Sequence, residues 1–234
     1  ETEIGENRRD RMAGKLGKLF EFISLIGQLK RIKRTGWVLR KVTDPESVAD
    51  HMYRMGVMAF LIDPGSGLSK EKCIKMSLVH DMAESIVGDL TPSDGVDKEE
   101  KHRREKTALM HICSLVSDDV GAELMSLWQE YEEQKTPESH YVMDLDKFDM
   151  IFQAYEYEQI DNKPGFLQEF FDSTSGKFQT ERVQTWAREL EELRNQSVSN
   201  EIFQSPELCR LKSLSSREAA VKPYRHSDSD APKK

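Results

Sequence analysis

The stretch that decides the fold is Val79-His80-Asp81-Met82-Ala83-Glu84-Ser85-Ile86. A histidine, His51, lies upstream of it and an aspartate, Asp146, lies downstream. One His, an adjacent His-Asp pair and a distant Asp can form the ligand set of one divalent metal with coordination positions left open. Imidazole nitrogen and carboxylate oxygen suit Mn, Fe, Co, Ni or Zn and, less well, Mg. An open position can hold a water or a phosphate oxygen, as metal-assisted hydrolysis requires.

The length and composition are those of a globular protein. The chain has 234 residues, enough for one domain of ordinary size with extensions or for two small domains. At 37% hydrophobic residues it can bury a core, and its net charge is −8. This acidic balance argues against a nucleic-acid polymer as the main partner. A small phosphate ester stays possible as a ligand, because a bound metal can reverse the local field.

The cysteines and the apolar runs bear on location. Cys73, Cys113 and Cys209 are widely spaced without a CxxC motif, which favours a reducing, intracellular and cytoplasmic setting. The chain lacks a run of about 18 apolar residues, so no membrane span is expected. The sequence begins at Glu1 without a Met, which leaves open that an organelle-targeting segment was removed.

Apolar residues recur at helical spacing along most of the chain, so we expect an all-α fold. Residues 1–15 are predicted to be a flexible segment, residues 16–195 one domain, and residues 196–234 a polar and flexible tail. Asp44 is expected to cap the second helix, with Pro45 in its first turn. The predicted helices cover 16–32, 44–62, 69–88, 97–115, 121–132, 136–160 and 178–195.

The His-Asp pair allows two interpretations. On a helix over 69–88, His80, Asp81 and Glu84 face one side because they are three or four residues apart. They could be a mutually satisfied polar pair with a surface carboxylate beside it. The surrounding residues are apolar, however, and burying a charged Asp without a strong partner is unfavourable. A metal is such a partner.

The two distant candidates are weaker on pattern alone. His51 lies on an apolar helix, where a histidine is more often a core residue than a ligand. On the predicted helix 136–160, Leu145 and Phe148 define an apolar stripe, and Asp149 projects nearer to its centre than Asp146 does. Periodicity therefore leaves Asp146 and Asp149 tied.

The order His51, His80-Asp81, Asp146 on an all-α chain resembles the HD-domain metal-dependent phosphohydrolases, and most closely their 5′-deoxynucleotidase family. The resemblance covers roughly residues 16–195. It is carried by the segments 37–40, 45–51, 80–89, 145–150 and 163–174.

The resemblance implies roles for particular residues. It makes His51, His80, Asp81 and Asp146 the ligands of a single metal. It implies that Glu84 positions or deprotonates the attacking water, or protonates the leaving 5′ oxygen. The family's second acidic residue falls on Asp89, which could reach the sugar, and its indole falls on Trp37, which could exclude a 2′-hydroxyl.

One position departs from the family pattern. The bacterial enzymes have an Arg directly before the Trp, where this chain has Gly36. Arg34 or Arg40 could supply the missing charge. Arg40 is the preferred candidate, because Arg34 also ends the basic run 30–34.

The expected activity is hydrolysis of deoxyribonucleoside 5′-monophosphates by a homodimer that uses one divalent metal, best Mn or Co. One alternative is another HD phosphohydrolase, acting on cyclic nucleotides or nucleoside polyphosphates. The latter would need several converging cations, and only Arg34, Arg40 and Arg54 lie near the motifs. The other alternative is a metal-stabilised interaction module without turnover. The presence of Glu84 and Asp89 beside the ligands argues against it. The charge run 98–106, which includes His102, is predicted to be a solvated helix face.

Overall fold

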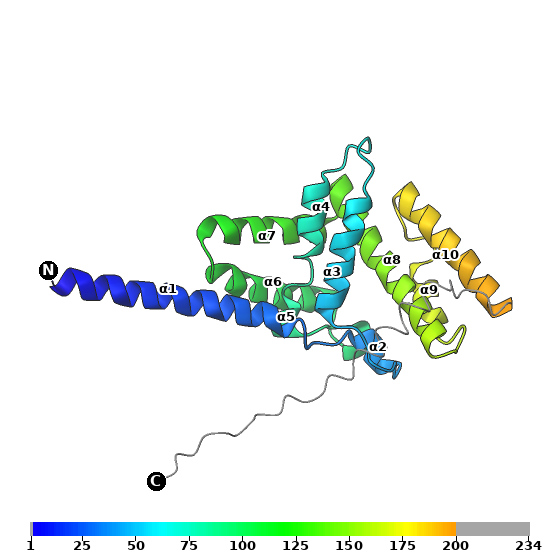
Figure 1. Cartoon of the computed structure of the whole chain (residues 1–234), viewed down its shortest axis with the longest axis horizontal. Coiled ribbons are helices and arrows are strands. Elements are labelled where there is room, and N and C mark those ends of the chain that lie inside the picture. The colour runs from blue at the N-terminus through cyan, green and yellow to red at the C-terminus, as the bar shows by residue number, and fades with distance from the viewer. Residues whose placement is uncertain (1, 200–234) are drawn as a thin grey trace, which may run out of the picture. The chain divides into compact units, whose positions relative to one another are not determined.

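The computed structural model describes the backbone of residues 2–199, which is helical with connecting loops (Figure 1). Lys33 and Ser47 form an isolated antiparallel bridge. The all-α prediction is confirmed. The helices are α1 (Thr2–Gln28), α2 (Thr35–Leu39), α3 (Val48–Met58), η1 (Ala59–Leu61), α4 (Lys70–Ser77), α5 (Glu84–Val87), η2 (Pro92–Asp94), α6 (Lys98–Ser114), α7 (Asp118–Glu133), α8 (Pro137–Ile160), α9 (Gln168–Thr174) and α10 (Glu181–Ser199).

Residues 1–192 form one compact unit, and a second unit starts at Leu193. Helix α10 continues through Ser199, beyond the predicted end at 195. Residues 200–234 of the predicted tail lie outside the described residues. At the other end, α1 begins at Thr2. The flexibility expected of residues 1–15 stays a prediction.

Helices α3, α4 and α8 pack together and form the centre of the core. Burying one large apolar side chain contributes about 1.5–3 kcal/mol, so several such contacts fix the three helices against one another. This matters for function because the predicted metal ligands lie on or directly after these helices. The buried side chains include Val48, Met52, Met55, Cys73, Met76, Leu145 and Ile151.

The ends of α6 and α8 follow the sequence signals. The Asp97 side chain accepts a hydrogen bond from the Glu100 amide, as an N-cap does. Thr136 and Ser139 form a capping box at the start of α8, with Pro137 in its first turn. The predicted starts of these two helices are confirmed.

The predicted start of α3 is wrong. Ser47, not Asp44, is its N-cap, and it forms a capping box with Asp50. Asp44 has a φ of +51°, in the left-handed region, where it belongs to the preceding turn. The short helices α2 and α9 were also not predicted, because five and seven residues are too few to show a helical period.

The largest difference concerns the His-Asp pair. Helix α4 ends at Ser77 and α5 begins at Glu84, so His80 and Asp81 lie in a tight turn rather than on one helix over 69–88. The Glu84 amide donates to the Asp81 carbonyl at 3.0 Å, three residues back, as in a 3₁₀ turn. The His80 ring forms a hydrogen bond, through Nδ1, with the Ser77 carbonyl oxygen at 2.9 Å. This carbonyl is at the end of α4.

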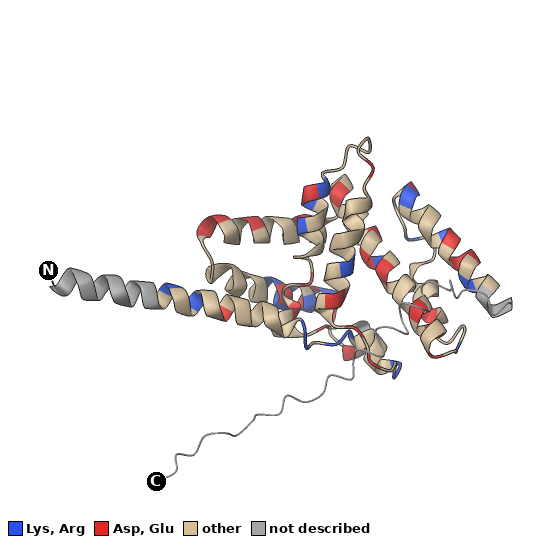
Figure 2. Ribbon diagram, in the orientation of Figure 1, with Lys and Arg blue, Asp and Glu red and all other residues tan. Residues whose placement is uncertain are grey.

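Charged residues of both signs are interspersed along the helices (Figure 2). None of the described helices is both long and apolar enough to cross a membrane.

Candidate metal centre and substrate pocket

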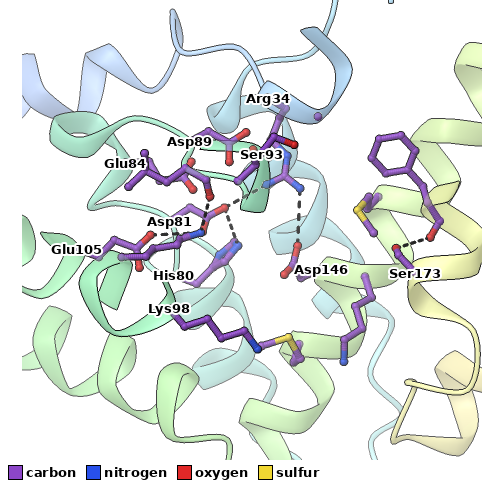
Figure 3. A pocket seen from close by; sticks show the side chains of 18 of the residues that line it. Arg34, His80, Asp81, Glu84, Asp89, Ser93, Lys98, Glu105, Asp146 and Ser173 are labelled. Atoms are coloured by element: carbon purple, nitrogen blue, oxygen red, sulfur yellow. Dashed lines mark hydrogen bonds and ion pairs between the residues drawn. The ribbon is translucent and has the colours of Figure 1, made fainter. Parts of the chain in front are cut away.

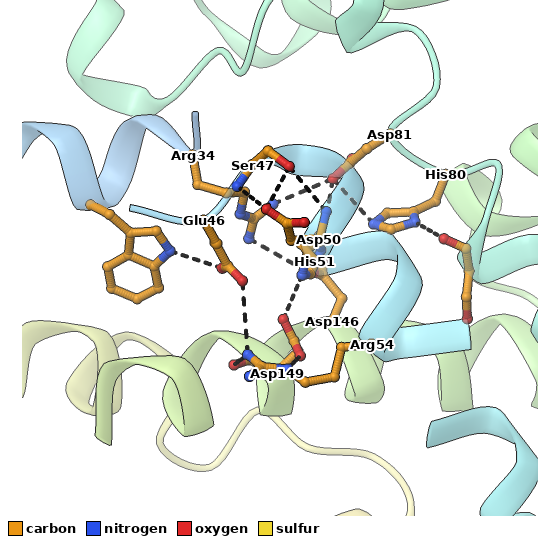
Figure 4. Close-up of polar contacts among 12 residues, drawn as sticks. Arg34, Glu46, Ser47, Asp50, His51, Arg54, His80, Asp81, Asp146 and Asp149 are labelled. Atoms are coloured by element: carbon orange, nitrogen blue, oxygen red, sulfur yellow. Dashed lines mark hydrogen bonds and ion pairs between the residues drawn. The ribbon is translucent and has the colours of Figure 1, made fainter. Parts of the chain in front are cut away.

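The four predicted ligands come together from three parts of the fold (Figure 4). His51 comes from α3, His80 and Asp81 from the turn before α5, and Asp146 from α8. His80 Nε2 lies 3.2 Å from Asp81 Oδ2, and His51 Nε2 lies 3.2 Å from Asp146 Oδ1. His51 Nε2 is also 3.8 Å from Asp81 Oδ2. The two imidazoles therefore direct the same ring atom at a shared pair of carboxylates.

The opposite nitrogen of each ring has its own partner. His51 Nδ1 lies 2.6 Å from Asp149 Oδ2, and His80 Nδ1 lies 2.9 Å from the Ser77 carbonyl oxygen. Since a carbonyl only accepts, His80 donates from Nδ1, and a donor at Nδ1 leaves the Nε2 lone pair free to bind a metal. Among the described residues, both Nε2 atoms are buried without a hydrogen-bond partner. A divalent cation beside these atoms would satisfy them, so the site fits a metal.

The carboxylates of the cluster are held ionised. Burial opposes the charge on Asp81, but His80 and Arg34 hold its pKa well below the usual range. Burial likewise opposes the charge on Asp146, and the adjacent His51 ring holds its pKa low. The Tyr131 hydroxyl donates to Asp146 Oδ2 at 2.8 Å. Two fixed anions beside two imidazoles suit a hard or borderline cation.

The same anions act on His51. Burial and the Arg34 guanidinium lower its pKa, but the carboxylates of Asp146 and Asp149, one beside each ring nitrogen, raise it more, to about 9. The cluster therefore attracts positive charge at the point where the two rings meet.

Asp149 resolves the tie that periodicity left open. It is fully buried and bound to His51 Nδ1, whereas Asp146 faces His51 Nε2. Arg54 Nε donates to the other Asp149 oxygen, and Arg54 Nη1 donates to Glu156 Oε2 at 2.7 Å. The two aspartates thus contact opposite nitrogens of the His51 ring. Asp149 orients this ring through Nδ1, the nitrogen that points away from the proposed metal site.

A cavity of about 800 Å³ opens beside this cluster (Figure 3). In that view Glu84 and Glu105 lie on one side of Asp146, and Ser173 of α9 lies on the other. Every predicted substrate residue lines it, together with cations and aromatic residues that the sequence analysis did not place there. The lining includes Arg34, Trp37, Arg40, Glu84, Asp89, Lys98, Lys101, His102, Glu105, Tyr131, Lys147, Glu169 and Phe170.

Glu84 is buried at 2% exposure, and its Oε2 atom has no hydrogen-bond partner among the described residues. Burial and the neighbouring Asp81 and Asp89 raise its pKa well above the ordinary value. A raised pKa favours the protonated form of the carboxyl group, which can donate its proton to a leaving group.

Asp89 fixes the loop that precedes α2. The Thr35 amide donates to Asp89 Oδ2 at 2.5 Å, and the Thr35 hydroxyl donates to the Asp89 carbonyl at 2.7 Å. These bonds connect the segment of Arg34 and Trp37 to the end of α5. Asp89 therefore lines the cavity and also holds the loop that lines it.

The two candidate arginines have different positions. Arg34 Nη1 donates to Asp81 Oδ2 at 3.3 Å, and its Nη2 is 4.0 Å from Asp146 Oδ1. Arg40 instead makes a two-point contact with Glu169 of α9, at 2.6 and 2.5 Å. The geometry favours Arg34, not Arg40, as the cation beside the metal ligands.

Trp37 is buried and held in place. Its Nε1 donates a hydrogen bond to Glu46 Oε1 at 2.9 Å. Its ring packs edge-on against the Tyr157 ring, with the two ring centroids 5.4 Å apart. The Tyr157 hydroxyl accepts a hydrogen bond from the Glu46 amide at 2.7 Å. The indole is therefore a rigid part of the cavity wall.

The charge run 98–106 is only partly a solvated face. Lys101 Nζ donates to the Leu90 carbonyl at 2.9 Å and pairs with Glu105 Oε1 at 3.5 Å. Glu105 is 8% exposed, and burial raises its pKa to about 7. The prediction is wrong for Glu105, because α6 packs against α5 and turns this residue inward.

Sequence reasoning also missed several residues of the site. Two of them, Tyr131 and Phe170, lack a local sequence signal because each contacts a residue from another element. Ser77 lacks one because it acts through its backbone carbonyl. Asp149 had a signal, since it lies one helical turn after Asp146.

This fold and this site define an HD-domain protein. The chain belongs to that family: the family model described as HD domain matches residues 26–186. Among solved structures, HD domain-containing protein YGK1 has 32% identity and a TM-score of 0.59, covering 78% of this chain and 88% of that one. A conserved hypothetical protein from Pyrococcus furiosus has 34% identity and a TM-score of 0.60, covering 76% of this chain and 99% of that chain.

Curated relatives place the chain within a narrower group. It is 51% identical over 181 residues to 5′-deoxynucleotidase HDDC2 of Homo sapiens, covering 77% of this chain and 88% of the relative. It is 41% identical over 173 residues to 5′-deoxynucleotidase YGK1 of Saccharomyces cerevisiae, covering 72% of this chain and 80% of the relative. The chain belongs with these HD-domain proteins.

Proposed function

We propose that this chain is a metal-dependent phosphomonoester hydrolase that converts deoxyribonucleoside 5′-monophosphates to deoxynucleosides and phosphate. The observation that carries the proposal is the pair of buried His51 and His80 Nε2 atoms directed at two ionised carboxylates beside a cavity. The names of the curated relatives, 5′-deoxynucleotidases at 41% and 51% identity, support the substrate class.

The metal would be held by His51, His80, Asp81 and Asp146. When bound, a divalent ion at such a site polarises the phosphate and lowers the pKa of a bound water. The mixed nitrogen and oxygen donors favour Mn or Co, and Mg, Fe, Ni and Zn remain candidates.

Arg34 and Glu84 are the proposed groups for phosphate and proton. Arg34 lies against Asp81 and Asp146, where its N–H groups can bind phosphate oxygens and offset their charge. As a water oxygen forms the new bond to phosphorus and the P–O5′ bond breaks, Glu84, buried and with a raised pKa, would give its Oε2 proton to the 5′ oxygen. The proton that the water loses would restore the Glu84 carboxyl group. The released deoxynucleoside thus leaves as a neutral alcohol.

Trp37 and Asp89 are the proposed sugar-sensing residues. The Trp37 ring is fixed by Glu46 and Tyr157, so it cannot move aside for a 2′-hydroxyl without breaking those contacts. Asp89 lines the same cavity and has a carboxylate that can accept from a sugar hydroxyl.

A nucleoside polyphosphate is the second candidate substrate, because five cationic residues line the cavity. Three of them are engaged with carboxylates: Arg34 with Asp81, Arg40 with Glu169, and Lys101 with Glu105. This pairing favours a monophosphate. The cationic residues are Arg34, Arg40, Lys98, Lys101 and Lys147.

A homodimer and a reducing, cytoplasmic compartment are further parts of the proposal. The compartment is supported by cysteine use: Cys73 and Cys113 are free thiols, and Cys209 lies outside the described residues. The dimer is supported only by the resemblance to the family. Its test is the mass in solution.

Phosphate release from dAMP, AMP, 3′,5′-cyclic AMP and dATP, with and without added Mn, tests the activity. We expect fastest release from dAMP and a requirement for metal. Preferred hydrolysis of dATP or cyclic AMP would overturn the substrate class. Absence of turnover on all four by metal-loaded protein would favour the interaction module.

A further inference from the structure

The cavity has two unlike ends beyond the metal ligands. The end at α6 is lined by Lys101, His102 and Glu105, and the end at α2 and α9 is lined by Trp37 and Phe170. Figure 3 shows Glu105 of α6 and Ser173 of α9 on opposite sides of Asp146. At the first end the charged groups pair with one another: Lys101 with Glu105, and His102 with Glu132 at 2.8 Å. The second end is aromatic.

Phe170 occupies a defined place at the aromatic end. Its ring centroid lies 4.4 Å from that of Trp37, with the planes tilted by 41°. A Cβ atom at Gly36 would come within 3.3 Å of Phe170 Cε1. A side chain at position 36 would therefore require the Phe170 ring to shift by a few tenths of an ångström.

A salt bridge holds α9 at this place. The Arg40 guanidinium of the segment after α2 binds Glu169 with both of its contacting nitrogens, and its Cζ lies 5.4 Å from the centroid of the Phe170 ring. Arg40 thus pairs with the residue before Phe170 and makes a cation–π contact with the Phe170 ring. Arg40 acts on the aromatic end of the cavity rather than on the metal cluster.

We propose that Phe170 is the residue on which the nucleobase stacks, and that Arg40 and Glu169 are positioning residues that hold it there. This inference rests on the proposed function, since it assumes a nucleotide whose phosphate lies at the metal end. The sugar then lies beside Trp37, and the adjoining surface that remains is the Phe170 ring. An aromatic platform accepts any base, because every base has a π face.

The test compares substrates with and without a base. We expect Phe170→Ala to lower kcat/KM for dAMP and dCMP about 10-fold, the range for losing one base–aromatic stack, mainly through KM. Hydrolysis of 2-deoxyribose 5-phosphate should change less than about 2-fold, because this substrate has no base to stack. Phe170→Tyr should retain the wild-type KM for dAMP.

Lys98→Ala probes the charged end of the cavity, which Lys98 lines. Phe166→Ala is the matched control, because Phe166 precedes α9 and is not among the residues that line the cavity. We expect this control to leave kcat/KM unchanged for both dAMP and 2-deoxyribose 5-phosphate. A selective rise of KM for dAMP in Lys98→Ala, with Phe170→Ala unaffected, would place the base at the charged end and overturn the proposal. Equal losses on dAMP and 2-deoxyribose 5-phosphate in Phe170→Ala would also overturn it.

The positioning role has its own test. Arg40→Glu and Glu169→Arg should each raise KM for dAMP, leave 2-deoxyribose 5-phosphate unaffected, and be rescued in the double variant, where the pair is restored with its signs exchanged. Lack of rescue would contradict the positioning role. If the wild-type protein hydrolyses neither substrate, the proposed function fails; if it hydrolyses both and only the Phe170 prediction fails, the base subsite alone is wrong.

Discussion

The end of the cavity with the proposed metal ligands (the metal end) and the aromatic end, which we propose binds the nucleoside (the nucleoside end), are built differently. At the metal end three of the four proposed ligands are fixed from behind: His51 by Asp149, His80 by the Ser77 carbonyl, and Asp146 by Tyr131. At the nucleoside end, α2 and α9 are joined by Arg40 and Glu169, whose side chains are 30% and 52% exposed. From this contrast we infer that phosphate hydrolysis depends on buried contacts that hold the side chains rigidly. Substrate choice depends instead on a partly exposed salt bridge, which water and salt can weaken.

The largest effect is expected at the metal end. His80→Ala removes a buried ligand and leaves Asp81 without its nearest partner. We predict loss of bound metal and a fall in turnover of more than about 100-fold, the upper range for losing only an outer partner of a ligand. Metal content by mass spectrometry and phosphate release measure both.

His111→Ala is the control for this variant, because His111 is exposed and pairs with Glu21 outside the cavity. It should retain both metal and activity. If His80→Ala kept its metal, His80 and Asp81 would be a structural pair, and the contrast between the two ends would lose its basis.

The next effect separates chemistry from metal binding. Glu84→Gln keeps the size of the side chain and removes the ionisable proton. We expect turnover to fall by about 100-fold, within the range for loss of a general acid or base, with metal content unchanged. Normal turnover in this variant would show that Glu84 has no part in the proton transfer.

Arginine substitutions compare the two ends directly. Arg34→Ala should raise KM by about 10-fold or more, since hydrogen bonds to charged groups contribute about 1.5–3 kcal/mol. The rise should be equal for dAMP, AMP and 2-deoxyribose 5-phosphate, because a phosphate contact carries no information on sugar or base.

Arg40→Ala should raise KM only for substrates that carry a base. Michaelis parameters for the same three substrates provide the comparison. If Arg40→Ala raised KM for all three and Arg34→Ala did not, the phosphate would bind near Arg40 and the assignment of the two ends would be reversed.

The smallest effect concerns sugar choice. Trp37→Phe and Asp89→Asn should each narrow the ratio of kcat/KM for dAMP over AMP by a few-fold, because discrimination by shape at an apolar wall is worth only about 1–3 kcal/mol in total. Folding is checked by thermal melting, since Trp37 is buried. An unchanged ratio in both variants would place sugar selection elsewhere.

The sequence predicted the metal end better than the nucleoside end for a physical reason. His80 and Asp81 are adjacent, and any fold must keep them together. Asp146 and Asp149 could not be separated by periodicity, because both face His51, one at each ring nitrogen. The tight turn around His80 was not predicted, since the apolar pattern of α4 continues through it.

The nucleoside end depends on contacts across long sequence separations. Arg40 and Glu169 are 129 residues apart, and either residue alone reads as an ordinary surface charge. Phe170 lies on a helix of seven residues, too short for a period to show. These contacts follow only from the packing of α9 against α8, which a local pattern does not contain.

The most direct test of the account is the metal dependence of dAMP hydrolysis. The protein is stripped with a chelator, its metal content is verified, and phosphate release is measured before and after adding Mn, Co or Ca. The account predicts no turnover in the stripped protein and recovery with Mn or Co that exceeds recovery with Ca, because imidazole donors suit the first two ions. Full activity in protein verified to be free of metal would contradict it.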